Sequence, residues 1–88
     1  MDIVKGSVVQ SKAGRDKGRF FLVVEVENDH ALIADGDLRK LNKPKRKKLR
    51  HLGATKTMLT LQEPLSDKSL YAEIKARFYS DDRQQKEG

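Results

Sequence analysis

Residues 19–27 contain the pattern that most constrains the fold of this chain. Apolar side chains fill the middle of the stretch, and its end alternates apolar with acidic side chains: Phe20, Phe21, Leu22, Val23, Val24, Glu25, Val26 and Glu27. A period of two is typical of a β-strand, and it assigns Val24 and Val26 to the same face. Turn-forming residues follow at 28–30, and a short apolar stretch comes next at 31–34. The sequence therefore predicts an antiparallel β-hairpin.

Further elements flank this hairpin on both sides. Residues 6–11 predict a first strand, and residues 12–18 predict a polar loop punctuated by two glycines. Residues 55–61 predict a last strand. Ser66 suits the N-cap of a helix, because Asp67 follows in the first turn and apolar side chains recur at Leu70, Ile74 and Phe78.

Together these elements predict a mainly β fold, specifically a small SH3-like barrel with a C-terminal α-helix. We expect the barrel to span residues 1–62, including a basic segment at residues 39–51. We expect residues 63–80 to form a helix packed on or beside the barrel. Residues 81–88 contain no apolar anchor, so they are expected to form a flexible tail.

The positive charge of the chain is concentrated in residues 39–50, which contain no acid and eight cations: Arg39, Lys40, Lys43, Lys45, Arg46, Lys47, Lys48 and Arg50. The other 76 residues carry 11 cations against 13 acids, a net charge of −2, although the whole chain carries +6. Pro44 disfavours a helix here, so we expect a strand or extended loop anchored by Leu38, Leu41 and Leu49. Charge of one sign in one place indicates a polyanionic partner, although charge by itself does not distinguish RNA from DNA.

Composition argues against several kinds of site. The chain has no cysteine, which excludes disulfides, thiolate nucleophiles and cysteine-ligated zinc. His30 and His51 are far apart in sequence, so we expect no metal and no other cofactor. No apolar stretch approaches the roughly 20 residues that span a bilayer, and the N-terminus lacks the pattern of a signal peptide. We therefore expect a cytoplasmic protein without a membrane partner.

Catalysis has little support in the sequence. Two pairs of carboxylates are close in sequence, but neither has a candidate partner or pocket: Asp35 with Asp37, and Asp81 with Asp82. A magnesium-dependent nuclease could use such pairs, and this is the weakest of the interpretations considered. We expect the protein not to be an enzyme.

Two stretches carry a resemblance to a known family. Residues 9–19, followed by the apolar residues 21–26, resemble a KOW motif, in which a basic glycine-containing loop joins two strands of an SH3-like barrel. Residues 31–36 then precede a basic segment that ends in Leu49, Arg50, His51 and Leu52. Over residues 3–79 the chain is similar to the large-subunit ribosomal protein family called fourteen-e. This resemblance implies binding to ribosomal RNA, with the loop at 12–19 and the segment at 39–51 facing the RNA.

The charge pattern and the resemblance predict contacts to phosphate and shape more than to base edges. The expected RNA-binding residues are Lys12, Arg15, Lys17, Arg19, Arg39, Lys40, Lys43, Lys45, Arg46, Lys47, Lys48, Arg50 and His51. The expected partner is structured RNA of the large ribosomal subunit, with neighbouring ribosomal proteins as further contacts. Outside the ribosome we expect a monomer.

Three alternatives remain open at this point. The domain could be a KOW-type protein-interaction module in transcription elongation or translation. Residues 43–48 also resemble a nuclear localisation signal. Aromatic side chains could stack on bases, although a core position is the simpler interpretation for Phe78 and for one of Phe20 and Phe21. Strand alternation then turns the other phenylalanine outward, to pack under the helix or to stack on RNA.

Overall fold

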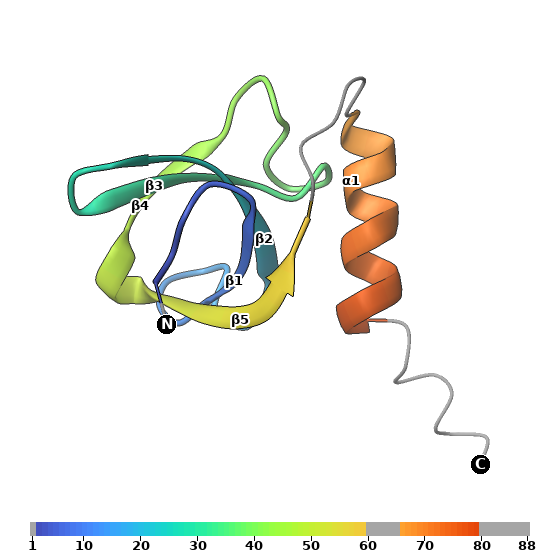
Figure 1. The fold of residues 1–88 in the computed structure, drawn as a ribbon. Helices are drawn as coiled ribbons and strands as arrows, with labels where there is room; N and C mark the ends of the chain where they lie inside the picture. The colour runs from blue at the N-terminus through green and yellow to red at the C-terminus, as the bar shows by residue number, and fades with distance from the viewer. Residues whose placement is uncertain (1, 60–65, 80–88) are drawn as a thin grey trace, which may run out of the picture.

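The computed structural model describes residues 2–59 and 66–79, and it is mainly β, as the sequence predicts. Five strands are followed by one helix (Figure 1). The strands are β1 (Ser7–Ser11), β2 (Phe20–Glu27), β3 (His30–Ala34), β4 (Lys45–Lys48) and β5 (Leu52–Met58). A 3-10 turn, Leu49–His51, joins β4 to β5. The helix α1 (Asp67–Ile74) continues as a π-helical segment, Lys75–Tyr79.

All neighbouring strands pair antiparallel in one sheet of order β4-β3-β2-β1-β5. The predicted hairpin of β2 and β3 is confirmed, with Val23 opposite Ile33. Strand β5 starts three residues earlier than expected, at Leu52, and pairs with β1. Within the described residues β4 and β5 are the two edges of an open sheet, although the strands curve around a common interior (Figure 1).

The sheet buries apolar side chains on both faces. The concave face encloses a core of Val9, Phe21, Val23, Ala31, Ile33 and Leu52. The other face presents Leu22 and Ala34 to Leu70 and Ile74 of the helix. Because both faces are covered, β2 is apolar at nearly every position in its first half, and simple alternation describes only its end.

The prediction that Val24 and Val26 share a face is wrong. The register of β2 against β3 shifts between Val23 and Glu25, so Val24 is the extra residue of a β-bulge. The bulge reverses the alternation. Val24 packs on the helix side, whereas Val26 packs against the concave core opposite Ala31.

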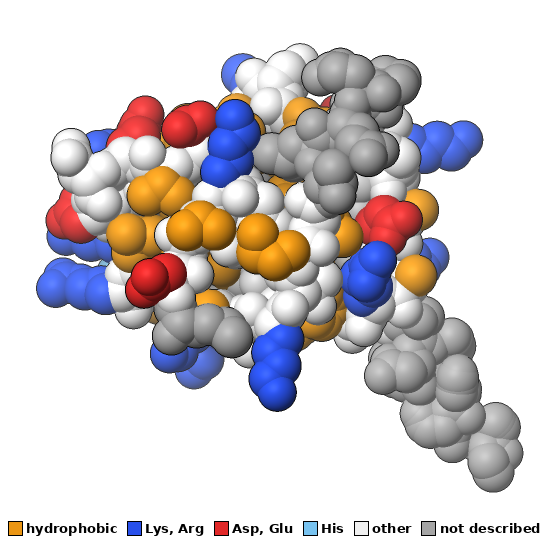
Figure 2. Space-filling view, in the orientation of Figure 1, with side chains coloured by type: hydrophobic (Ala, Val, Ile, Leu, Met, Phe, Trp, Pro, Cys, Tyr) orange, Lys and Arg blue, Asp and Glu red, His pale blue; other side chains and the backbone are white. Residues whose placement is uncertain are grey.

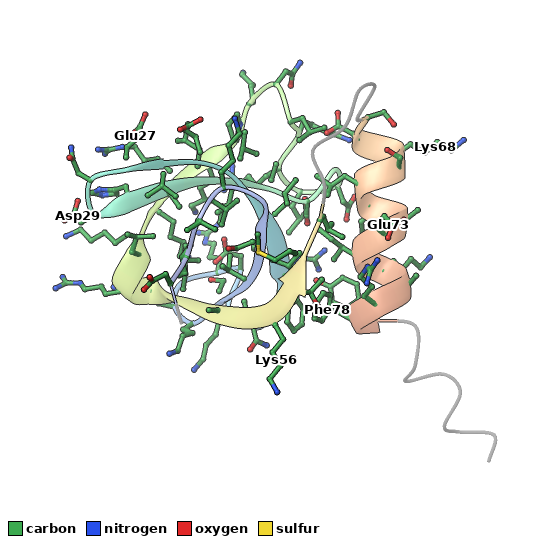
Figure 3. All side chains as sticks on the ribbon, viewed as in Figure 1. Glu27, Asp29, Lys56, Lys68, Glu73 and Phe78 are labelled. Atoms are coloured by element: carbon green, nitrogen blue, oxygen red, sulfur yellow. The ribbon has the colours of Figure 1, made fainter. Side chains whose placement is uncertain are left out.

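The C-terminal helix begins where the sequence predicts. The Ser66 side chain accepts a hydrogen bond from the Ser69 backbone N–H at 3.1 Å, which caps the first turn. Leu70 and Ile74 are fully buried against the sheet. Phe78 points toward the strands, whereas Lys68 points away from them (Figure 3). The predicted tail at residues 81–88 lies outside the described residues.

An aromatic cluster fastens the far end of the helix to β2. Phe20 stacks on Phe78 with ring centroids 4.1 Å apart, and its backbone N–H donates to the Tyr79 hydroxyl at 2.9 Å. Phe21 lies in the concave core. Of the two places open to the outward phenylalanine, the structure therefore puts Phe20 under the helix.

The start of the helix rests on the loop between β3 and β4. Gly36 adopts a positive φ of 81°, and a Cβ atom there would collide with the Asp67 carbonyl. The Asp67 carboxylate accepts from the Leu41 backbone N–H at 2.7 Å. Leu41 and Leu49 are anchors as predicted, but Leu38 is not, because 54% of it is exposed.

Surface side chains are unevenly distributed. On the face seen in Figure 2, hydrophobic side chains gather in the middle, over the strands, and basic side chains project from the margin. No helical segment in the described part of the chain is long and apolar enough to cross a membrane.

Candidate nucleic-acid interface

Strand β4 holds four of the eight cations of residues 39–50 and divides them between the two faces of the sheet. Lys45 pairs with Ile33 and Lys47 pairs with Ala31, and both partners belong to the concave core. Residues directly opposite in an antiparallel pair point to the same face. Lys45 and Lys47 therefore lie on the concave face of the sheet, whereas Arg46 and Lys48 lie on the opposite face.

Lys47 is a correction to the predicted site. Only 8% of it is exposed, and its ammonium group donates to the Asp16 carboxylate and to the Ala13 carbonyl, each at 2.7 Å. A lysine that is buried and hydrogen-bonded in this way is not available to a phosphate. Its role is to hold the loop at residues 12–18 against β4.

Asp16 is the acceptor that makes this arrangement possible. Its Oδ1 accepts from Lys47 and from the Ser11 hydroxyl, both at 2.7 Å, and its Oδ2 lies 4.0 Å from the Lys45 ammonium. Burial acts to raise the pKa of Asp16, but these two hydrogen bonds and the charges of both lysines together hold that pKa below its ordinary value. Asp16 is therefore ionised and joins the two segments predicted to face RNA.

A second buried carboxylate shapes the loop between β3 and β4. Asp35 accepts hydrogen bonds from the backbone N–H groups of Asp37 and Arg39, both at 2.9 Å. Its own backbone N–H donates to the Arg39 carbonyl at 2.9 Å. This closed turn holds Leu38 and Arg39 outward, on the side of the loop at residues 12–18.

These two loops and β4 border a groove of about 370 Å³, lined by Arg15, Asp16, Leu38, Arg39 and Lys45. We call it the basic groove. Arg15 and Arg39 are exposed, and the Lys45 side chain is one-third exposed. Since Lys47 neutralises Asp16, the three remaining cations give the basic groove a net positive charge.

A smaller depression of about 260 Å³ lies at the other end of β4. It is lined by Asp29, Lys48, Leu49 and Arg50. Asp29 has a lowered pKa, chiefly because the His30 ring is hydrogen-bonded to it at 2.8 Å. Lys48 and Arg50 are exposed and make no ion pair with any residue in the described ranges.

Two other predicted site residues are engaged with acids. Arg19 lies 3.7 Å from Asp35 and 3.5 Å from Asp37, and its guanidinium sits over the Tyr79 ring. Arg46 pairs with Glu27 at 3.4 Å. Arg19 therefore supports the fold, and it also forms ion pairs with both Asp35 and Asp37, the carboxylates considered for a nuclease. The other pair, Asp81 and Asp82, lies outside the described residues.

The remaining predicted residues are on the surface. Four of them are exposed lysines without an acidic partner in residues 2–59 and 66–79: Lys12, Lys17, Lys40 and Lys43. His51 is half-buried in the 3-10 turn, and its carbonyl accepts from the Lys12 backbone N–H at 2.8 Å. The predicted cations thus lie over two loops, β4 and the 3-10 turn, and the basic groove collects three of them.

Sequence reasoning missed the roles of Asp16 and Asp35. Asp16 is a single acid among the cations of its loop, and a lone acid of this kind is a candidate for a buried ion pair with a basic strand. In the sequence, Asp35 stands out only as one half of a carboxylate pair with Asp37. Its position before Gly36 was the available signal for a side chain that caps its own turn.

No protein-family model matches this chain, and no curated protein matches it either.

Proposed function

We propose that this protein binds structured RNA through the basic groove and the exposed cations around it. The observation that carries the proposal is the convergence of Arg15, from the loop after β1, with Arg39 and Lys45, from the cationic stretch 39–50, on one hollow. Cations held around a hollow suit a phosphate backbone, because binding releases the counterions condensed on the nucleic acid.

Resemblance supports a more specific form of the proposal. The loop at residues 12–18 joins β1 to β2 like the loop of a KOW motif, and the strand order β4-β3-β2-β1-β5 is compatible with an SH3-like barrel. By analogy with the fourteen-e ribosomal family, the proposed partner is ribosomal RNA of the large subunit. The proposed setting is the cytoplasm, on or near the ribosome, with the protein taking part in translation without catalysis.

The ion pair between Asp16 and Lys47 strengthens the argument for a built surface. A loop that only connects two strands does not need a buried, charge-assisted contact to a third strand. This contact holds Arg15 at a set place relative to Lys45, as shape recognition of RNA requires.

The test is binding of ribosomal RNA fragments by a variant that removes the three groove cations, Arg15→Ala, Arg39→Ala and Lys45→Ala. Each lost phosphate contact lowers the slope of log affinity against log salt by about 0.7–0.9. We expect the slope of the triple variant to be smaller in magnitude by roughly 2–3. We also expect the triple variant to lose most of its affinity for the RNA. Lys47 is left intact, because its removal would disturb the fold.

The matched control replaces three exposed lysines away from the basic groove, Lys56→Ala, Lys68→Ala and Lys75→Ala. It removes the same charge, and Lys56 and Lys68 project from β5 and α1 (Figure 3). Equal losses in the two variants would indicate diffuse charge attraction and contradict a site at the groove. A flat salt dependence in the unmodified protein would contradict RNA binding and favour a protein-interaction module.

A further inference from the structure

The basic groove contains one feature that phosphate binding does not use. Asp16 is a groove-lining carboxylate that is only 7% exposed, and its Oδ2 has no hydrogen-bond donor among residues 2–59 and 66–79. Its Oδ1, in contrast, accepts two hydrogen bonds. A buried carboxylate oxygen without a donor is costly, so its presence at a binding surface calls for a function.

The position of Oδ2 follows from its neighbours. Oδ1 faces Lys47 and Ser11, in the interior, whereas Oδ2 faces the Lys45 ammonium at 4.0 Å. Lys45 itself lines the basic groove. Oδ2 therefore faces the groove-lining Lys45, whose ammonium lies beyond hydrogen-bond distance.

Binding of a phosphate gives Lys45 a better partner. A phosphate oxygen between Arg15, Arg39 and Lys45 draws the lysine ammonium toward itself, and a lysine side chain changes rotamer at little cost. We expect this movement to expose Oδ2 beside the bound phosphate. The group best placed to occupy it is a hydrogen-bond donor one sugar away from that phosphate.

We propose that Asp16 Oδ2 accepts a hydrogen bond from a ribose 2′-hydroxyl, so that the basic groove selects RNA over DNA. This inference rests on the proposed function and names the chemistry of the same site. Carboxylates recognise ribose hydroxyls in dinucleotide-binding proteins, and the 2′-hydroxyl is the group that distinguishes RNA from DNA. The groove volume, about 370 Å³, is in the range of small-ligand sites. Leu38, which is more than half exposed, provides an apolar contact for the sugar or the base.

The experiment compares one fluorescein-labelled hairpin with an unpaired loop, made in three versions: RNA, DNA and 2′-fluoro RNA. The fluorine keeps the RNA-like sugar pucker but has no hydrogen to donate. We expect the unmodified protein to bind the RNA hairpin about tenfold more tightly than either other version, the effect of one hydrogen bond to a charged group. Equal affinity for RNA and 2′-fluoro RNA would overturn the inference, because shape would then account for all discrimination.

A variant locates the effect at Asp16. Asp16→Asn keeps an oxygen for Lys47 and Ser11 but replaces Oδ2 with a donor, so the tenfold preference should fall to within about twofold. A preference that persists in folded Asp16→Asn would also overturn the inference. Lys45→Ala is the companion variant: it should weaken binding of all three hairpins and preserve their ratio. If Asp16→Asn does not fold, the comparison of RNA with 2′-fluoro RNA on the unmodified protein still tests whether a 2′-hydroxyl is recognised.

Failure of this inference is distinguishable from failure of the proposed function. If binding depends on salt but is equal for the three hairpins, phosphate binding at the groove is supported and only the role of Oδ2 is contradicted. Absence of binding to any hairpin removes both.

Discussion

The ammonium group of Lys47 lies 2.7 Å from the Asp16 carboxylate, with only 8% of either side chain exposed. This contact joins the loop after β1 to the edge strand β4. It also separates the cations of residues 39–50 into those that stabilise the fold and those that remain available to bind a phosphate. A test of function that replaced residues 45–48 as one block would therefore confuse unfolding with loss of binding.

Removing Lys47 should destabilise the protein strongly. Lys47→Ala leaves the Asp16 charge buried beside the Ser11 hydroxyl, with the Lys45 ammonium 4.0 Å away, and breaking a buried pair from one side costs about 3 kcal/mol or more. For a domain of this size the midpoint of thermal unfolding should fall by roughly 10–20 °C. The control, Lys48→Ala, removes an exposed lysine and should change the stability by less than about 0.5 kcal/mol. Equal effects in the two variants would show that Lys47 is not an internal ion-pair partner.

The same contact predicts a dependence of stability on pH. The pKa of Asp16 is lowered in the folded state, so folding favours its ionised form. Its contribution is fully present above the unfolded pKa of about 3.9 and is lost as the pH falls through the lower folded value. Unfolding followed by circular dichroism should show the stability advantage of the unmodified protein over Asp16→Asn shrinking as the solution is acidified below pH 4. An advantage that grows in acid would contradict the lowered pKa.

Gly36 should be intolerant of a side chain. Gly36→Ala places a Cβ atom against the Asp67 carbonyl and strains a residue with positive φ, so it should separate the helix from the β3–β4 loop. Gly18→Ala is a matched control, because Gly18 has a similar φ of 91° but open space around its Cβ position. Urea unfolding should show a loss of about 1 kcal/mol for Gly18→Ala and a clearly larger loss for Gly36→Ala. Similar losses would mean that the helix does not depend on this close approach.

The Tyr79 hydroxyl should contribute to docking of the helix end. Tyr79→Phe removes the acceptor of the Phe20 backbone N–H and should cost about 1 kcal/mol. Tyr71→Phe removes a hydroxyl that makes no hydrogen bond within the described part of the chain, so its stability should be nearly unchanged. Hydrogen exchange at the Phe20 amide gives a local readout, and exchange that is no faster in Tyr79→Phe than in the unmodified protein would contradict the contact.

Local elements followed closely from the sequence. The β2–β3 hairpin, the N-cap at Ser66 and the apolar positions Leu70 and Ile74 depend on short-range periodicity and capping, which a single sequence displays. The bulge at Val24 did not follow. A β-bulge is set by how one strand pairs with its neighbour, and nothing in the run of valines marks the extra residue.

For the candidate site, the sequence by itself determined where the positive charge lies along the chain and that it needs a surface. Only the tertiary structure decided which cations remain available. It turned Lys47 inward onto Asp16, paired Arg19 with Asp35 and Asp37, and brought Arg15, Arg39 and Lys45 around one hollow. The physical reason is that an ion pair depends on distances of a few ångströms between residues far apart in sequence, and those distances exist only after the sheet has formed.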